Sequence, residues 1–267
     1  MLKDVTLGQY FPGDTAVHRL DPRTKLILVV VYIAALFVAE GLVGYLLVFA
    51  FLTAAYATAR IKPSVALKGL KPLLFIICLT GALNLFFTPG EPLLQFWIVT
   101  ITREGVFSAL FMIWRIMMLV TGTFLLTYTT SPIALTDGLE RVLGPLRYLK
   151  VPVHELSMMM CIALRFIPTL IEETDKIISA QKARGADFES GNIFRRVKAL
   201  IPVLVPLFVS AFRRADELAV AMECRCYQGG KGRTRMRQLK YVRRDILALS
   251  LGFALLAAVI ALRVLGF

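Results

Sequence analysis

Apolar residues in this chain gather into long runs that alternate with short polar stretches. Five of these runs are candidates to cross a bilayer, at residues 26–39, 42–59, 72–87, 106–130 and 245–264. A spanning helix needs about 20 apolar residues, so the first run must extend through Thr24 and Lys25 or lie in thinned bilayer. The pattern predicts an all-α integral membrane protein with about five transmembrane helices.

Two short signals define the N-terminal helices. Asp21 and Pro22 directly precede the first run, and proline suits the first position of a helix. Only Glu40 and Gly41 separate the first run from the second, which predicts a tight helical hairpin with Glu40 outside the membrane. One long tilted helix is the alternative, in which an acid and a glycine at the middle would be costly in lipid.

The stretch 151–230 has a different pattern. Its two apolar runs, 156–171 and 199–212, each continue into a charged half that ends in a short arginine motif. We expect two long amphipathic helices over about 152–184 and 193–225. The expected organisation is an N-terminal arm with four transmembrane helices (1–130), a cytosolic domain that contains the two long helices (131–245) and a C-terminal transmembrane helix (246–267).

The arginine motif occurs twice, as Ala183-Arg184-Gly185 and as Cys224-Arg225-Cys226, with the arginines 225 − 184 = 41 residues apart. This is an internal repeat of one helix. The end of a helix leaves unpaired carbonyls and a negative dipole end, so each arginine is expected at a helix tip. A guanidinium there can bind both oxygens of a partner's carboxylate. An ordinary capping arginine is the alternative, and the repetition favours docking.

These motifs, with the segment HRLDPRTK at residues 18–25, give the chain a resemblance to the transmembrane T component (EcfT type) of energy-coupling factor (ECF) transporters. The resemblance covers essentially the whole chain. In that family the arginine tips dock into grooves on two ATP-binding cassette (ABC) ATPase subunits, and apolar flanks hold a small membrane protein, the S component, that captures a vitamin or metal. The resemblance implies a non-catalytic subunit of the cell membrane, with ATP and Mg bound by its partners and no cofactor of its own.

The second motif departs from the family pattern, because cysteine replaces alanine at Cys224 and glycine at Cys226. Cysteine is small enough for close packing but lacks the freedom of glycine at positive φ. The cap of this helix can therefore slide to Gly229-Gly230, which leaves the docking geometry of this tip open.

Composition and charge agree with a membrane protein. The chain is 57% hydrophobic with a mean hydropathy of +0.70 and a net charge of +13. Residues 137–245 hold 20 basic against 12 acidic side chains, and residues 60–71 hold four basic and no acidic ones. The positive-inside rule places these segments and the N-terminus in the cytoplasm. A nucleic-acid partner is excluded, since the arginine-bearing helices lack interleaved exposed aromatic residues.

Two residues of the membrane section stand out. Arg115 lies about nine residues, or ~14 Å, inside the outer end of the fourth run, where an arginine must find a partner. A functional role and a snorkelling or structurally paired arginine are both open. The run 93–101 is too short to span, so it is expected at the outer interface with Trp97 as an anchor.

Signatures of catalysis or of a metal site are weak. The four cysteines fit no zinc spacing, and only His18 and His154 could join the one Cys-x-Cys pair. The segment GGKGRT at 229–234 lacks the spacing of a phosphate loop. The acidic turn Glu172-Glu173-Thr-Asp175 resembles a metal–diphosphate site weakly, and a solvated or ion-paired face is favoured.

Alignment of the two arginine motifs places Glu172 and Glu173 at positions equivalent to Arg213 and Arg214. Opposite charges at equivalent levels predict an ion pair where the two helices cross. The alternative is a local pair with Asp216 or Glu217 at the usual helical spacing.

The interpretation that follows is a scaffold that couples ATP hydrolysis in partner subunits to import of vitamins or other micronutrients. A self-sufficient secondary transporter is the first alternative, although it needs a midplane site that these spans offer only at Arg115, Asn84 and several threonines. A membrane transferase is the second, and it would need a paired acidic site.

Overall fold

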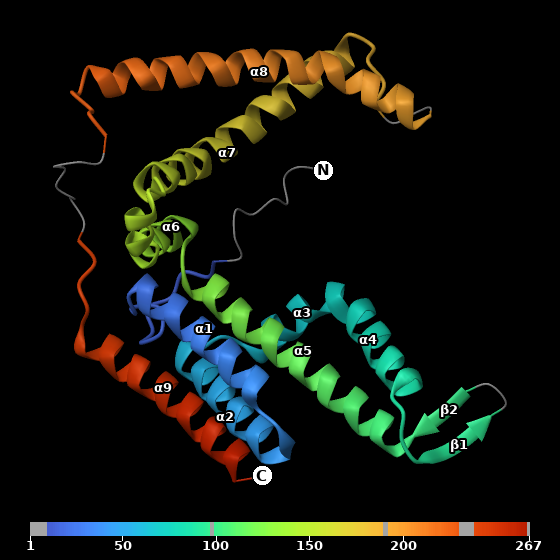
Figure 1. Ribbon diagram of the computed structural model, residues 1–267. Helices are drawn as coiled ribbons and strands as arrows, with labels where there is room; N and C mark the ends of the chain where they lie inside the picture. Colours follow the sequence, from blue (N-terminus) through green and yellow to red (C-terminus); the bar gives the residue numbers. More distant parts are fainter. Residues whose placement is uncertain (1–9, 97–98, 189–191, 230–237, 266–267) are drawn as a thin grey trace. The chain divides into compact units, whose positions relative to one another are not determined.

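A computed structural model describes residues 10–96, 99–188, 192–229 and 238–265 (Figure 1). The chain forms two compact units, one built from residues 8–139 and 239–267 and the other from residues 140–238. Compactness does not report which segments lie in the cytosol, so the division at residues 130 and 245 stays a prediction.

The larger unit is helical, and its helices begin and end close to the polar signals. The N-terminal hairpin is confirmed, because Ala39 and Glu40 are non-helical and Gly41 has a φ of +72°. A single long helix over both runs is therefore wrong. The helices of this unit are α1 (Pro22–Val38), α2 (Gly41–Ala59), α3 (Pro63–Leu70), α4 (Leu74–Phe87), α5 (Arg103–Thr129), α6 (Pro132–Val142, shared with the other unit) and α9 (Arg243–Val264).

Two features of this unit differ from the expectation. The third helical segment begins at Pro63 and not at Pro72, which lies in a 3₁₀ turn, Lys71–Leu73, that joins α3 to α4. The expected interfacial run forms an antiparallel hairpin of β1 (Pro92–Phe96) and β2 (Val99–Thr102). Apart from this hairpin the described elements are helical, which confirms the all-α class. Trp97 lies outside the described residues.

Helix α5 organises the packing of the larger unit, since α1, α2, α3 and α4 all pack against it (Figure 1). Two tyrosine hydroxyls donate hydrogen bonds to backbone carbonyls of α5. Tyr32 donates to Met118 at 2.9 Å, and Tyr56 donates to Thr121 at 2.8 Å. Buried polar groups in a membrane protein need such partners. The core between these helices and α9 consists of residues such as Ala35, Leu36, Val48, Leu52 and Val259.

The HRLDPRTK segment joins three helices of this unit. Asp21 is the N-cap of α1 with Pro22 at the first helical position, which confirms the predicted helix start. The backbone N–H of Asp21 donates to Asp245 of α9 at 2.8 Å, and Lys25 Nζ donates to the carbonyl of Thr129 in α5 at 2.7 Å. The segment therefore fixes the start of α1 to neighbouring ends of α5 and α9.

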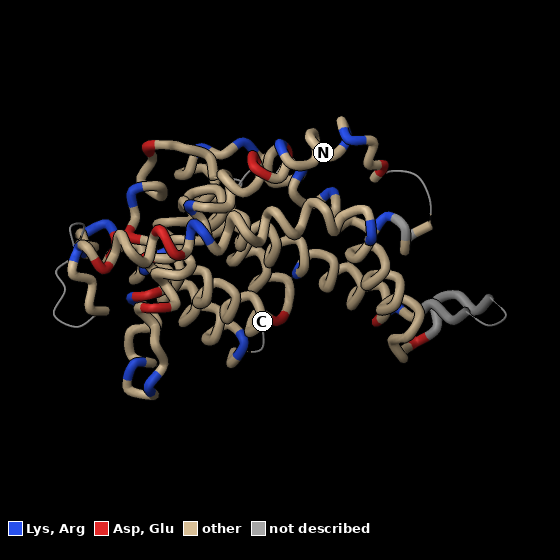
Figure 2. Tube along the Cα trace, turned by 90° about the horizontal axis from the view of Figure 1, so that it is seen from above, with Lys and Arg blue, Asp and Glu red and all other residues tan. Residues whose placement is uncertain are grey.

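Five described helical segments are long and apolar enough to cross a membrane: α2, α3 with α4, α5, α7 (Val153–Ala183) and α9. The predicted number is confirmed, but the membership differs. Helix α1 has only 17 residues and falls short on length, whereas α7 qualifies through its apolar first half. Most of the trace in Figure 2 is uncharged, and Lys, Arg, Asp and Glu gather in short stretches. Many large apolar side chains are exposed, as lipid-facing residues would be.

Candidate coupling site

Two helices of equal length carry the arginine motifs. Helix α7 and helix α8 (Ile193–Glu223) have 31 residues each, as the apolar periodicity predicts, and both belong to the smaller unit. Both continue through internal prolines, Pro168 in α7 and Pro202 and Pro206 in α8. A 3₁₀ helix, Gly144–Leu149, precedes α7.

Helix α7 ends in a Schellman motif. The N–H of Ala186 donates to the carbonyl of Gln181 and the N–H of Gly185 donates to the carbonyl of Lys182, both at 3.0 Å. Gly185 has a φ of +88°, in the left-handed region that glycine adopts without strain. Arg184 is the C-cap residue. The backbone therefore presents the side chain of Arg184 at the end of the helix.

Helix α8 ends in the same way, although its motif lacks glycine. The N–H of Tyr227 donates to Met222 at 3.1 Å and the N–H of Cys226 donates to Glu223 at 2.8 Å. Cys226 itself adopts a φ of +55°. The expectation that the cap slides to Gly229-Gly230 is therefore wrong, because the terminal hydrogen bonds hold Cys226 in the left-handed conformation. Gly230 and the rest of the GGKGRT segment lie outside the described residues.

The two arginine tips are free to meet a partner. Arg184 and Arg225 occupy equivalent cap positions, and both are exposed. Within the part of the chain that the structure describes, neither guanidinium has an ion pair or a side-chain hydrogen bond. Ala183, Cys224 and Cys226 beside them are exposed as well. The five N–H donors of each guanidinium thus remain available for carboxylates.

Helices α7 and α8 cross in Figure 1, and an ion pair joins them. Arg214 Nη2 lies 2.9 Å from Glu173 Oε2, and Ser210 donates its hydroxyl to the other oxygen of Glu173. Both charged side chains are half-buried, at 35% and 25% exposure. Glu172 and Arg213 are exposed, and no ion pair of Arg213 with Asp216 or Glu217 occurs among the described residues.

The crossing has an approximate two-fold character. Glu173 and Arg214 are equivalent under the 41-residue repeat, so exchange of the two helices maps their contact onto itself. Away from this point, Gln181 Nε2 approaches the carbonyl of Pro202 at 3.5 Å. The exchange maps this contact onto residues 202 − 41 = 161 and 181 + 41 = 222, and Met222 lines a cavity of about 290 Å³ together with Ile162, the residue next to position 161. The tips are therefore at matching distances from the crossing.

Arg115, in the larger unit, has partners that sequence reasoning missed. Its Nε donates to the hydroxyl of Tyr45 at 2.7 Å. Its guanidinium also lies over the rings of Tyr45 and Phe37, at 5.5 Å and 6.0 Å from the centroids. The sequence showed no acidic partner for Arg115, because the residues that stabilise its charge are neutral. Tyrosine contributes a hydroxyl and a ring face, and phenylalanine contributes a ring face.

The described residues contain no group of three His, Cys, Asp or Glu side chains that could hold a metal ion. In the acidic turn, Glu173 is engaged by Arg214 and Ser210. Ser210 was not predicted, since a serine in an apolar helix usually bonds its own backbone. His154 pairs with Glu140 at 3.0 Å between α6 and α7.

The sequence is similar to a known protein family and to individual proteins. Residues 13–236 match the family described as CbiQ, cobalt transport protein. The chain is 52% identical over 250 residues to the energy-coupling factor transporter transmembrane protein EcfT of Clostridium kluyveri, covering 93% of each chain. The proteins of that name from Ruminiclostridium cellulolyticum and Bacillus subtilis are 53% identical over 247 residues and 48% identical over 246 residues, and at least 92% of each chain is covered. The similarity seen in the motifs thus extends along nearly the whole sequence.

Proposed function

This chain belongs to the CbiQ family of cobalt transport proteins and is a T component of the energy-coupling factor type, and we propose that it transmits ATPase motions to a substrate-capturing membrane protein. The observation that carries the proposal is the pair of equivalent arginine tips. Arg184 and Arg225 each lie 11 residues beyond the crossing pair, about 16 Å along a helix. Two matched arginine tips that are related by an approximate two-fold axis fit a partner made of two similar subunits.

The partners of the tips are two ABC-type ATPase subunits. Each arginine binds a carboxylate-lined groove on one subunit, and ATP and Mg stay with those subunits. Closure of the ATPase pair moves the tips, and the rigid crossing at Glu173 and Arg214 transmits this movement to the apolar halves of α7 and α8. The chain itself performs no catalysis and holds no cofactor.

The apolar halves supply the second surface. Most large apolar side chains of α8 between Val197 and Phe212 are exposed, whereas Val203 is buried. A small membrane protein, the S component, binds this face and captures a vitamin or other micronutrient. The assembly resides in the cell membrane, with the N-terminus and both tips in the cytoplasm and membrane lipid around the larger unit.

Mass spectrometry of everything that purifies with the tagged chain in mild detergent tests the proposal. We expect two ATPase subunits and at least one small membrane protein. A self-sufficient secondary transporter would purify alone and would move its substrate without ATP hydrolysis. A chain that purifies alone and drives uptake in ATP-free vesicles would therefore contradict the proposal.

A further inference from the structure

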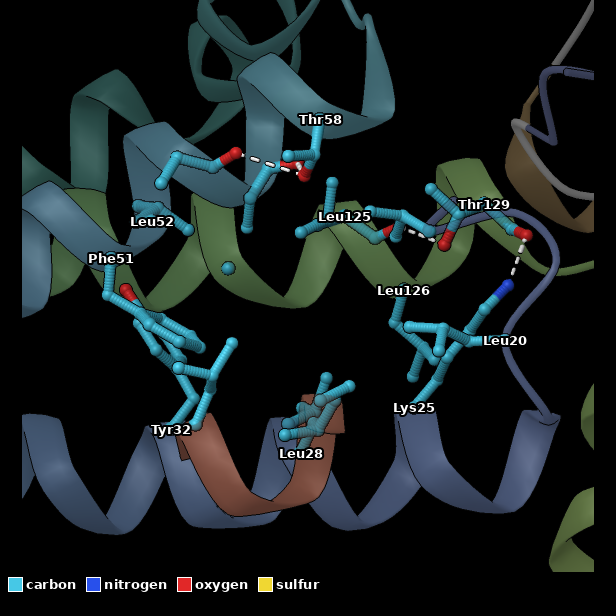
Figure 3. Close-up of a pocket in the computed structure, with 17 residues that line it drawn as sticks. Leu20, Lys25, Leu28, Tyr32, Phe51, Leu52, Thr58, Leu125, Leu126 and Thr129 are labelled. Atoms are coloured by element: carbon cyan, nitrogen blue, oxygen red, sulfur yellow. Dashed lines mark hydrogen bonds between the residues drawn. The ribbon is translucent and has the colours of Figure 1, made fainter. Parts of the chain in front are cut away.

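A cavity of about 370 Å³ lies within the larger unit, and it is separate from the coupling site (Figure 3). The N-terminal arm and helices α1, α2, α5 and α9 supply its walls. Along α1, the residues Lys25, Leu28 and Tyr32 line two turns of the cavity, which corresponds to ~10 Å. Lys25 lies at one end in Figure 3, and Tyr32 and Phe51 lie at the other.

Almost no polar atom is available to a molecule inside this cavity. Of the polar side chains in its wall, Tyr32 donates to Met118, Thr58 donates to Ala54 and Ala55, and Thr129 donates to Leu125. A buried water needs two to four polar partners, so water is poorly held here. The occupant that fits such a wall is a hydrocarbon chain.

The ammonium group of Lys25 gives the cavity one charged end. Lys25 is only 6% exposed, and its Nζ donates to the carbonyls of Thr129 at 2.7 Å and His18 at 3.2 Å. An ammonium has three donors, and the third N–H has no partner among the described residues. A buried cation bound only by neutral carbonyls favours an anion nearby.

In the described part of the chain, no neighbouring carboxylate contacts this ammonium directly, although Asp245 acts on it electrostatically from beyond ion-pair distance. Asp21 is engaged by the guanidinium of Arg23 through both oxygens, at 2.9 Å and 3.1 Å. Asp245 accepts hydrogen bonds from the backbone N–H groups of Asp21 and Val242. Both acids are therefore satisfied by other donors, and the ammonium of Lys25 forms no ion pair within the described residues.

The cavity also lies where headgroups of one leaflet would be. Lys25 is near the start of α1, Thr58 near the end of α2, Thr129 at the end of α5 and Ala248 near the start of α9. Basic residues flank the same helix ends: Arg60 and Lys62 after α2, and Arg243 and Arg244 at the start of α9. Such clusters attract anionic lipids of the cytoplasmic leaflet.

We propose that this cavity binds one acyl chain of an anionic phospholipid, with the lipid phosphate facing the ammonium of Lys25. The chain lies along α1 between Lys25 and Tyr32, and the headgroup takes the free N–H of Lys25. The lipid would fill the space between α1, α2, α5 and α9. The assignment of this lipid to the cytoplasmic leaflet rests on the orientation given under the proposed function. The binding of the lipid does not depend on that orientation.

Native mass spectrometry of the full chain, purified in mild detergent, tests the proposal by counting bound lipid. The protein is titrated with phosphatidylglycerol or phosphatidylcholine of identical chain length. We expect one phosphatidylglycerol to bind about fivefold more tightly than phosphatidylcholine, the effect of one lysine near an anionic headgroup. Equal binding of the two lipids, or retention of detergent alone as an adventitious additive only, would overturn the proposal.

Three variants locate the site. Ala55→Phe projects a ring into the cavity from α2, and we expect it to abolish the single tightly bound lipid. Ala57→Phe is the control, since Ala57 is exposed on the same helix and does not line the cavity. Lys25→Met should remove the preference for phosphatidylglycerol while phosphatidylcholine still binds. Unchanged binding in Ala55→Phe would overturn the proposal even if Lys25→Met fails to fold. No ATPase is needed, so this outcome is independent of the coupling function.

Discussion

Glu173 accepts a hydrogen bond from Arg214 at 2.9 Å, and each residue lies 11 positions before the arginine at the tip of its own helix. The ion pair thus joins equivalent points of the two repeats. A contact at equivalent points places the two tips symmetrically about the crossing, which is the geometry that a two-subunit partner requires.

Charge reversal at the crossing should lower stability and be repaired by the second reversal. Glu173→Arg or Arg214→Glu places like charges in a half-buried contact, and we expect a loss of ~1 to 2 kcal/mol, between the values of exposed and buried pairs. The double variant should recover much of this loss in thermal unfolding of the purified chain. Glu172→Arg is the exposed control and should change stability little. Strictly additive losses in the double variant would show that the pair is not coupled.

Removal of the tip arginines should uncouple transport. Arg184→Ala and Arg225→Ala each lose a charge-assisted contact, so we expect uptake to fall about tenfold or more. Lysine should rescue poorly, because it lacks the two-pronged fork. The readouts are substrate uptake and the yield of the complex, with the exposed Arg213→Ala as a control on the same helix. A double alanine variant with normal uptake and normal complex yield would refute the coupling role.

Loss of the glycine at the end of α7 and introduction of a glycine at the end of α8 should change helix stability in opposite directions. At Gly185 an added Cβ would meet no atom within 4 Å, so Gly185→Ala tests backbone strain alone and should cost ~1 kcal/mol at its φ of +88°. Cys226→Gly relieves strain at +55° and should stabilise the end of α8 by ~0.5 to 1 kcal/mol. Hydrogen exchange of the last turns of α7 and α8 measures both effects. A loss of protection in Cys226→Gly would contradict this account.

The proposed orientation predicts a labelling pattern. In a background without the four natural cysteines, Glu91→Cys should react with an impermeant thiol reagent from outside intact cells. Asp187→Cys should react only after the membrane is opened. Both positions are exposed in the structure, so differences in labelling report the side of the membrane. Labelling of position 187 from outside would reverse the assigned topology.

The N-terminal arm should loosen in acid. Burial lowers the pKa of His18, and the nearby ammonium of Lys25 lowers it further. The neutral ring bonds Thr15 through Nδ1 at 2.7 Å and the carbonyl of Phe11 through Nε2 at 3.1 Å. Because the folded pKa lies below the unfolded value of about 6.5, the folded state loses stability as pH falls below that value. His18→Gln should lose less stability between pH 7.5 and 5.5 than the parent chain in thermal unfolding, and an equal loss would exclude His18 as the cause.

Local signals in the sequence determined where most helices begin and end. Pro22 at the first position of α1, the break at Glu40 and Gly41, and the arginine motifs at the ends of α7 and α8 all act through the backbone of their own segment. Such effects depend on neighbours within one or two helical turns, so they can be read without a tertiary structure. The spacing of 41 residues between Arg184 and Arg225 is likewise a property of the chain alone.

Tertiary structure alone decided which of the candidate charges meet. Glu173 pairs with Arg214 while Glu172 and Arg213 stay exposed, because one residue along a helix turns a side chain by about 100° and only one face is at the crossing. The Thr129 carbonyl that binds Lys25 and the Tyr45 hydroxyl that binds Arg115 come from helices distant in sequence, and neither group carries a charge that a sequence pattern could reveal. Cys226 adopts positive φ because two terminal hydrogen bonds outweigh its local preference, and residue type by itself could not show that balance.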